Sequence, residues 1–348
     1  MKRDKKEQDI KNVKDILLHQ NPILFIGAGF SYGSSNEKGD LPTGPQLNER
    51  IFKKFVQGKV DNTVEMEVKD YDLPDTCQFI YDDMKKQEEL KEFIFSCLKN
   101  AQPCEFHLLL NSYPWSRIYS LNVDDLVENI CKKNKVGLVV QNTGHEKATD
   151  NKLEYIKLHG CVNEPSEAIV FSRSEYTNLI STKNYKLDKL YTDIVDRNII
   201  FIGASMEESD IDYIVTQYEK AGALRKGKFI FVDPYPKVKL KSKINNFDGI
   251  LLQCTAEDFL KFVADLKYDP TEEKRRKMRL NYNGFFLYQD ILTNYSSADM
   301  YESRLYEGFN CNWQDIFNDW VFESQAIVNL EKKIEKLSFD SYDRIKSI

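Results

Sequence analysis

The sequence predicts an α/β fold: a Rossmann-like, mainly parallel sheet with helices on both faces, a helical insertion and a helical C-terminal region. Three observations support this class. Short apolar segments alternate with helical segments between residues 22 and 253, which is typical of parallel sheets covered on both faces. The first apolar segment breaks into a glycine turn. Polar motifs directly follow several later apolar segments, at the strand ends where such sheets gather ligands.

The N-terminal third is predicted to surround the first strand with helices. A charged helix at 5–20 carries one apolar stripe and leads into a strand at 22–27. A loop rich in Gly, Ser and Asn covers 32–43, where a mobile cover over a ligand and a plain surface loop are both open. A helix is predicted for 46–57. Residues 56–112 show helical patterns with little strand signal, so we expect a helical insertion beside the sheet.

Seven further apolar segments are predicted to complete the sheet, with helices between several of them. They lie at 117–121, 137–141, 154–158, 168–171, 198–202, 228–232 and 249–253. Beyond about residue 270, aromatic residues are crowded among charges, and Trp313, Phe317 and Trp320 lie on one helical stripe. We therefore expect a catalytic domain at 1–268 and a helical, aromatic-rich region at 269–348. That region packs its own core or forms an oligomer or partner surface.

Composition narrows the functional class. The 348 residues exceed the usual domain length of about 150, in keeping with a large α/β domain plus a second unit. The net charge of −6 argues against direct nucleic-acid binding, and the densest basic run, at 274–277, follows two acids as a solvated helix face would. The longest apolar runs are far shorter than the roughly 20 residues of a membrane helix, so no membrane contact is expected.

The seven cysteines are scattered, odd in number and never spaced C-x-x-C, and no N-terminal signal peptide is recognisable. This pattern predicts reduced thiols in a cytoplasmic protein. A structural zinc site would need two close Cys/His pairs. His107 and His159 each lie near one cysteine, but neither spacing repeats. We therefore predict no metal.

The turn after the first strand, Gly27-Ala28-Gly29-x-Ser31, predicts nucleotide binding. Its glycines permit a tight turn and a close approach of the main chain, and the next segment offers N–H groups and a positive helix end to a pyrophosphate. A plain glycine turn between a buried strand and a helix remains open. The full G-x-G-x-x-G pattern is absent, because Tyr32 takes the place of its third glycine.

Asn122 and Asp124 follow the segment at 117–121 and precede a helix, which aims both at a ligand beyond the strand end. An Asp at this place is also a common helix cap. An Asn amide can both accept from and donate to a ribose hydroxyl or a water. His159 follows the segment at 154–158, and Gly160 lets the chain turn so that the imidazole projects. It suits a general base, while a structural histidine remains open.

Two later strands also end in candidate binding residues. The segment at 198–202 runs into Gly203-Ala204-Ser205, which is followed by several acids and also fits a capped helix. The segment at 228–232 ends at Asp233, whose carboxylate can hold an adenosine hydroxyl or start a turn.

The order of these motifs resembles the NAD-binding order of the sirtuin fold. It is more closely similar to the sirtuin-like NAD hydrolase domains of prokaryotic anti-phage defence proteins. Three further short motifs support the resemblance: Leu41-Pro42-Thr43, His107-Leu108-Leu109-Leu110 and Asp212-Tyr213-Ile214. The resemblance covers about residues 20–265. The chain lacks the four-cysteine zinc module of sirtuin deacylases, and Leu121 replaces the Gln of their Gln-Asn-Ile-Asp. Both departures argue against deacylation.

The resemblance implies an NAD+ hydrolase with NAD as its substrate and no metal. His159 would accept a proton from a ribose hydroxyl or water, and Asn122 would orient the ribose and the attacking water. Asp124 would contact the nicotinamide end or hold its loop. The pyrophosphate would be held at Gly27, Ala28, Gly29 and Ser31. Gly203, Ser205 and Asp233 would lie nearer the adenosine.

The resemblance also implies a cytoplasmic effector of anti-phage defence that depletes NAD. Its expected partners are other copies in a homo-oligomer and a phage-derived activator or a second defence protein, with 269–348 as the place for that control. Two other functions remain open. A protein deacylase would consume NAD only with an acyl-lysine peptide, and a non-catalytic sensor would bind NAD or ADP-ribose without turnover.

Overall fold

The computed structural model describes residues 2–141, 152–164, 169–182, 184–204, 214, 216–220, 222, 226–246 and 248–266. These residues belong to one compact unit, Met1–Tyr268. The helical, aromatic-rich region predicted at 269–348 lies outside the described residues and stays a prediction.

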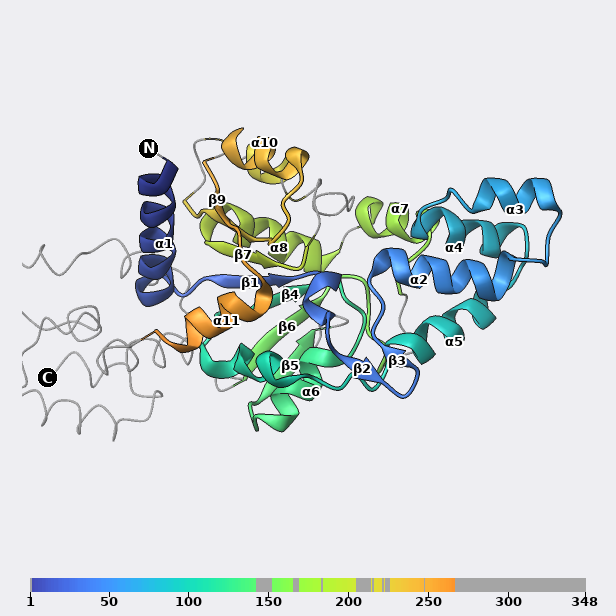
Figure 1. Cartoon of the computed structure of the whole chain (residues 1–348), viewed down its shortest axis with the longest axis horizontal. Helices are drawn as coiled ribbons and strands as arrows, with labels where there is room; N and C mark the ends of the chain where they lie inside the picture. The colour runs from blue at the N-terminus through green and yellow to red at the C-terminus, as the bar shows by residue number, and fades with distance from the viewer. Residues whose placement is uncertain are drawn as a thin grey trace, which may run out of the picture. The chain divides into compact units, whose positions relative to one another are not determined.

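Seven parallel strands form one sheet in the order β5-β6-β4-β1-β7-β8-β9 (Figure 1). The strands are β1 (Ile23–Ile26), β4 (Ile118–Ser120), β5 (Leu138–Gln141), β6 (Leu153–Lys157), β7 (Ile199–Ile202), β8 (Phe229–Val232) and β9 (Ile250–Leu252). Ile26 aligns with Ser120 on one side and with Ile202 on the other. The chain extends the sheet in opposite directions on the two sides of β1, so the crevice at the end of β1 is a switch point where ligands bind in such sheets.

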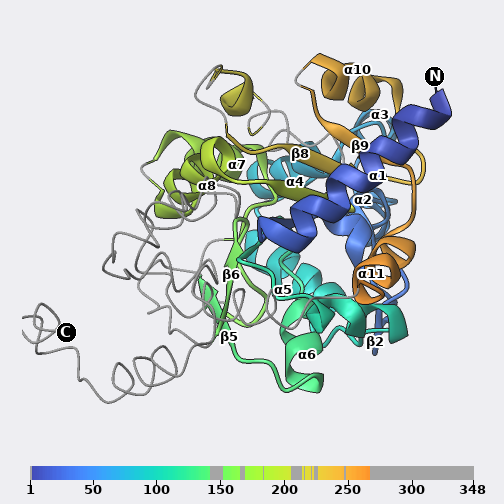
Figure 2. The ribbon, with the colours of Figure 1, turned by 90° about the vertical axis from the view of Figure 1, so that its left-hand side faces the viewer.

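Helices cover both faces of the sheet (Figure 2), which confirms the predicted fold class. Alternate residues of β1 face opposite sides: Leu24 and Ile26 belong to one apolar cluster, and Ile23 and Phe25 to the other. The first cluster includes side chains of α1 (Lys2–His19), η3 (Glu105–Ser112), α6 (Leu126–Lys133) and α11 (Ala256–Ala264). The second includes side chains of α8 (Tyr185–Asp196) and α10 (Val238–Asn246). Among the described helices, none combines the length and apolar character needed to cross a membrane.

A helical unit with its own core lies beside the sheet (Figure 1). It comprises α2 (Gly44–Ile51), η2 (Phe52–Val56), α3 (Asn62–Val68), α4 (Leu73–Asp82), α5 (Gln87–Leu98) and α7 (Arg173–Ser181). The loop expected at 32–43 contains a hairpin of β2 (Ser35–Asn36) and β3 (Gly39–Asp40). The core of the unit also includes Val123 and Val162, which follow β4 and β6. The helical unit therefore packs against the loops at the carboxyl ends of two strands.

The strand predicted at 168–171 is wrong over its described residues, 169–171, which form an irregular segment. Ile169 and Phe171 are buried in the core of the helical unit, and the Val170 amide donates to the His159 carbonyl at 3.0 Å. The apolar run therefore reflects a buried loop. A buried loop and a fully buried strand both give a continuous apolar run, so the sequence pattern does not distinguish them.

Candidate active site

Four of the sequence-predicted motifs meet at the carboxyl ends of β1, β4, β6 and β7. Pairing continues one residue past the strands, because the Leu121 amide donates to the Ile26 carbonyl at 3.1 Å and the Leu158 amide to the Ser120 carbonyl at 2.9 Å. Since β4 lies between β1 and β6, the loop that carries Asn122 lies between the glycine turn and the loop that carries His159.

Two glycine turns pack directly against each other at this edge. The amides of Gly27 and Gly29 donate to the carbonyls of Ile202 and Gly203, at 3.0 and 2.9 Å. Gly203 has a φ of +66°, and a Cβ on it would lie 2.1 Å from the Phe30 nitrogen. These glycines are therefore required by backbone contact between the turns. Because both amides are used inside the protein, pyrophosphate contacts predicted at Gly27 and Gly29 would not use these N–H groups.

Gly203→Ala is expected to lower the free energy of unfolding by more than about 2 kcal/mol, because a positive φ alone costs roughly 1–2 kcal/mol before any clash. Gly58 is the matched control: its φ is +67°, but nothing lies within 4 Å of its Cβ position. Gly58→Ala should therefore lower the free energy of unfolding only by the cost of a positive φ, without a steric clash. Urea denaturation measures both variants, and equal costs would contradict a tight contact between the turns.

Asn122, Ser31 and Asp124 form one buried polar cluster beside the first turn. The Asn122 Nδ2 group donates to the Gly27 carbonyl (3.1 Å) and to Ser31 Oγ (3.0 Å). Ser31 in turn donates to Asp124 Oδ2 at 2.8 Å. The side chain of Asn122 is thus held by both its donor hydrogens. Its oxygen has no hydrogen bond among the described residues, so it is available to accept one from a ribose hydroxyl or a water.

Burial raises the pKa of Asp124, while the Lys157 ammonium and the Ser31 hydroxyl act in the opposite direction. The other carboxylate oxygen of Asp124 accepts the Leu126 amide at 3.1 Å, at the start of α6. Asp124 therefore accepts the first amide of α6, from the position before the N-cap residue Asp125, and holds Ser31 against Asn122.

His159 lies in the turn after β6 and is 6% exposed. Gly160 has a φ of +90°, which provides the sharp turn predicted for this motif. The imidazole meets the ring of Tyr176 edge-on, with centroids 5.2 Å apart. The histidine is thus placed by the turn on one side and by α7 on the other.

Sequence reasoning assigned no role to two residues that support the site. The His107 Nε2–H group donates to the Phe30 carbonyl at 2.7 Å, and Nδ1 accepts the Cys104 amide at 3.2 Å. Burial lowers the pKa of His107, in keeping with a neutral ring that holds the first glycine turn. Asp125 accepts amides of the segment before η3, Asn100 at 3.0 Å and Ala101 at 2.8 Å. In the sequence, His107 begins the His107-Leu108-Leu109-Leu110 motif and Asp125 directly follows Asp124.

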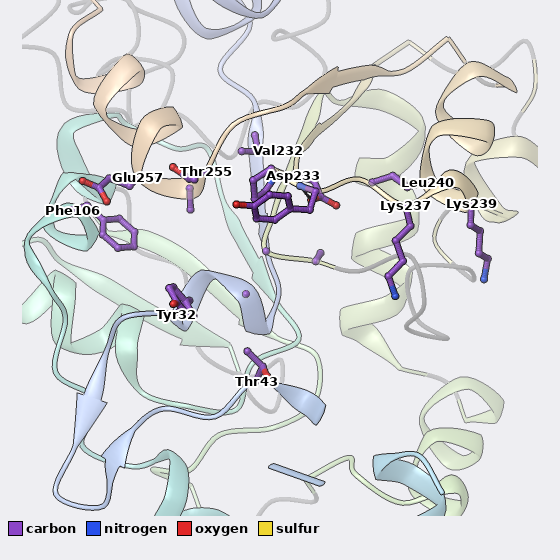
Figure 3. Close-up of a pocket in the computed structure, with 16 residues that line it drawn as sticks. Tyr32, Thr43, Phe106, Val232, Asp233, Lys237, Lys239, Leu240, Thr255 and Glu257 are labelled. Carbon is purple, nitrogen blue, oxygen red and sulfur yellow. Dashed lines mark hydrogen bonds between the residues drawn. The ribbon is translucent and has the colours of Figure 1, made fainter. Parts of the chain in front are cut away.

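A cavity of about 580 Å³ opens on the other side of the glycine turn, over the ends of β7, β8 and β9 (Figure 3). Gly29, Gly203 and Asp233 line it, as do Thr43 and Thr255 at the starts of α2 and α11. In addition, Tyr32 and Tyr235 line the cavity and are strongly exposed. Asp233 Oδ1 accepts the Tyr235 amide at 2.8 Å, so this residue does start a turn. Ser205 and the acids at 207–212 lie outside the described residues.

The arrangement defines a class of protein: an α/β protein whose candidate site lies beside a glycine turn, at the switch point of a parallel sheet. Within the described ranges, no group of three or more His, Cys, Asp or Glu side chains could hold a metal ion. A family model for the SIR2-like domain matches residues 116–261.

The chain is also similar to two curated proteins, over longer alignments than the family match. The chain is 25% identical over 218 residues to the NAD(+) hydrolase ThsA of Cytobacillus dafuensis. It is 27% identical over 222 residues to the NAD(+) hydrolase ThsA of Bacillus cereus (strain MSX-D12). The alignments cover 61% of this chain but 41% and 43% of the relatives, so the chain spans less than half their length. The predicted resemblance to sirtuin-like NAD hydrolases is confirmed.

Proposed function

We propose that this chain is an NAD+ hydrolase that cleaves the nicotinamide–ribose bond to give nicotinamide and ADP-ribose. The observation that carries the proposal is the buried cluster of Asn122, Ser31 and Asp124 at the switch point of the sheet, with His159 in the next loop. The similarity to two proteins named NAD(+) hydrolase supports it.

The dinucleotide would lie across the first glycine turn. The cavity over β7 to β9 would take the adenosine, and the other oxygen of the Asp233 carboxylate would accept a ribose hydroxyl. The pyrophosphate would lie against Ala28 and Ser31, at the start and end of η1. The nicotinamide ribose would then reach the Asn122 and His159 loops on the far side of the turn.

The chemistry requires little acid catalysis, because the cationic nicotinamide of NAD+ leaves as a neutral base. A water oxygen forms a bond to C1′ of the ribose as the C1′–N bond breaks, and the electron pair stays on nicotinamide. His159 takes the proton from this water, and the side-chain oxygen of Asn122 accepts a hydrogen bond that orients the water or the ribose. Attack by a ribose hydroxyl in place of water would give a cyclic product.

The test of this function is nicotinamide release from NAD+ by the purified chain without any peptide. Turnover supports the hydrolase. Turnover that appears only with an acyl-lysine peptide would replace this proposal by a deacylase. Binding of NAD+ without turnover in either condition would favour a sensor or an effector that awaits its trigger.

We also propose that the chain is a cytoplasmic effector of anti-phage defence, working as a homo-oligomer with a phage-derived activator or a second defence protein. The resemblance to defence hydrolases supports this role, and 269–348 is the proposed place of control. Cells that carry the chain should lose NAD after phage infection, and cells that carry His159→Ala should not. Equal NAD levels in the two infected cultures would contradict the effector role.

A further inference from the structure

A buried ammonium lies under the site, and the mechanism above does not use it. Lys157 is the last residue of β6, two residues before His159, and its side chain is fully buried. Its Nζ group donates to the carbonyls of Val123 (3.2 Å) and Asp124 and to Glu128 Oε1 (2.8 Å). The three hydrogens of the ammonium are therefore matched by three oxygens.

The partners of Lys157 come from both loops that carry the proposed catalytic groups. Val123 and Asp124 directly follow Asn122 in the loop after β4. Cys161, whose Sγ lies 3.4 Å from Lys157 Nζ, belongs to the turn that begins with His159. The same two loops are joined by the Val162 amide, which donates to the Val123 carbonyl at 2.9 Å. The ammonium thus lies where the Asn122 loop meets the His159 loop.

Burial of the Lys157 ammonium at this place is energetically unfavourable compared with burial of an apolar side chain. Taking an ammonium out of water is unfavourable unless it is paired and hydrogen-bonded, and an apolar side chain of similar volume often stabilises a fold at least as well. Burial opposes the charge on Lys157, but Glu128, Cys161 and Asp124 outweigh it and raise the pKa of this lysine. Lys157 therefore stays charged at neutral pH, which suits a geometric role better than packing alone.

We infer that Lys157 is a positioning residue of the site, whose ammonium holds the Asn122 loop against the His159 loop in the arrangement that turnover requires. The inference rests on the proposed function, because Asn122 and His159 are its catalytic groups.

The experiment compares Lys157→Met with Lys189→Met. Lys189 is the matched control, since it also pairs with a buried carboxylate of β6, Glu154 at 2.8 Å, but at the other end of that strand. Both variants are titrated with ADP-ribose, and kcat for nicotinamide release is expressed per ADP-ribose site. Lys157→Met should lose at least about 10-fold in kcat per site with ADP-ribose affinity changed less than about 3-fold, while Lys189→Met keeps kcat per site.

The pH profile provides a readout that a merely structural lysine would not move. The charged groups that act on Asp124 are Lys157, which lowers its pKa, and Glu128, which raises it. If Asp124 must be ionised to hold Ser31, Asp124 and the base His159 together set the acid limb of kcat, and Lys157→Met moves the contribution of Asp124 to higher pH. Glu128→Gln moves it to lower pH, and this variant keeps the inference testable where Lys157→Met does not fold.

Two outcomes separate the inference from the function on which it rests. An active wild type with unchanged kcat per site in Lys157→Met, or with the acid limb unmoved in Glu128→Gln, would overturn the positioning role alone. A wild type that binds ADP-ribose, releases no nicotinamide and does not lower NAD in infected cells would overturn the proposed function and this inference together.

Discussion

His159→Ala is expected to lower turnover of NAD+ by roughly two to four orders of magnitude, the usual contribution of a positioned general base. No other side chain is assigned the proton of the attacking water, so the loss should fall on kcat. Asn122→Ala should also remove most turnover. It additionally releases the hydrogen bonds of 3.1 and 3.0 Å that hold Gly27 and Ser31, so its affinity for ADP-ribose should fall as well.

The two variants are measured by nicotinamide release and by ADP-ribose titration. His19→Ala is the control, because His19 is an exposed histidine near the end of α1. It should match the wild type in both assays. Undiminished turnover in His159→Ala would show that another group takes the proton, and the mechanism would need a different base.

The second large effect is on stability, and it concerns a buried ion network below the site. Arg117 Nε donates to Glu154 at 2.6 Å, and its Nη1 donates to Asp193, which also accepts the Tyr119 hydroxyl at 2.6 Å. The side chains of Arg117, Glu154 and Asp193 are only 6–7% exposed. Arg117→Met should lower the free energy of unfolding by about 3–5 kcal/mol, because it leaves two buried carboxylates without this partner.

Arg173→Met is the matched control in urea denaturation. Arg173 binds Asp72 at 2.7 Å and Asp75 at 2.5 Å, but its side chain is 46% exposed, so its loss should cost only about 0–1 kcal/mol. Equal costs for the two arginines would contradict the assigned role of burial.

The cost of Arg117→Met should also depend on pH. Burial raises the pKa of Glu154, but Arg117 and Lys189 outweigh it and hold this pKa below its ordinary value of 4.5. A lowered carboxyl pKa contributes stability that is present above the unfolded value and is lost as pH falls through the folded value. The difference between wild type and Arg117→Met should therefore narrow below about pH 4.5.

The positions of the strands were predictable because each is a short apolar run that stops at a turn residue. The run at 23–26 ends at Gly27, and the run at 199–202 ends at Gly203. The failure at 168–171 has the same origin. A buried loop segment and a buried strand share one apolar pattern. They differ in whether an adjacent strand offers backbone groups for pairing, which the pattern does not show.

Which residues lie at the candidate site was predictable from the sequence, but the contacts between them were not. Ser31, Asn122 and Asp124 were each found from their place after a strand. Their hydrogen bonds join positions 91 and 93 residues apart, which no local pattern reports. Lys157 was given no role from the sequence because a lysine inside a strand is normally assigned to a solvated face. Its burial depends on the loops that close over it.

The sequence by itself determined the fold class, the strand ends and the residue types placed at them, because periodicity and turn chemistry are properties of neighbouring residues. Only the tertiary structure decided that Gly27 and Gly29 serve contact with Gly203, that both donor hydrogens of Asn122 are held inside the protein, and that Lys157 joins two loops. These features depend on backbone groups that meet only when the sheet forms. Their cost or benefit is set by burial, which a linear pattern does not contain.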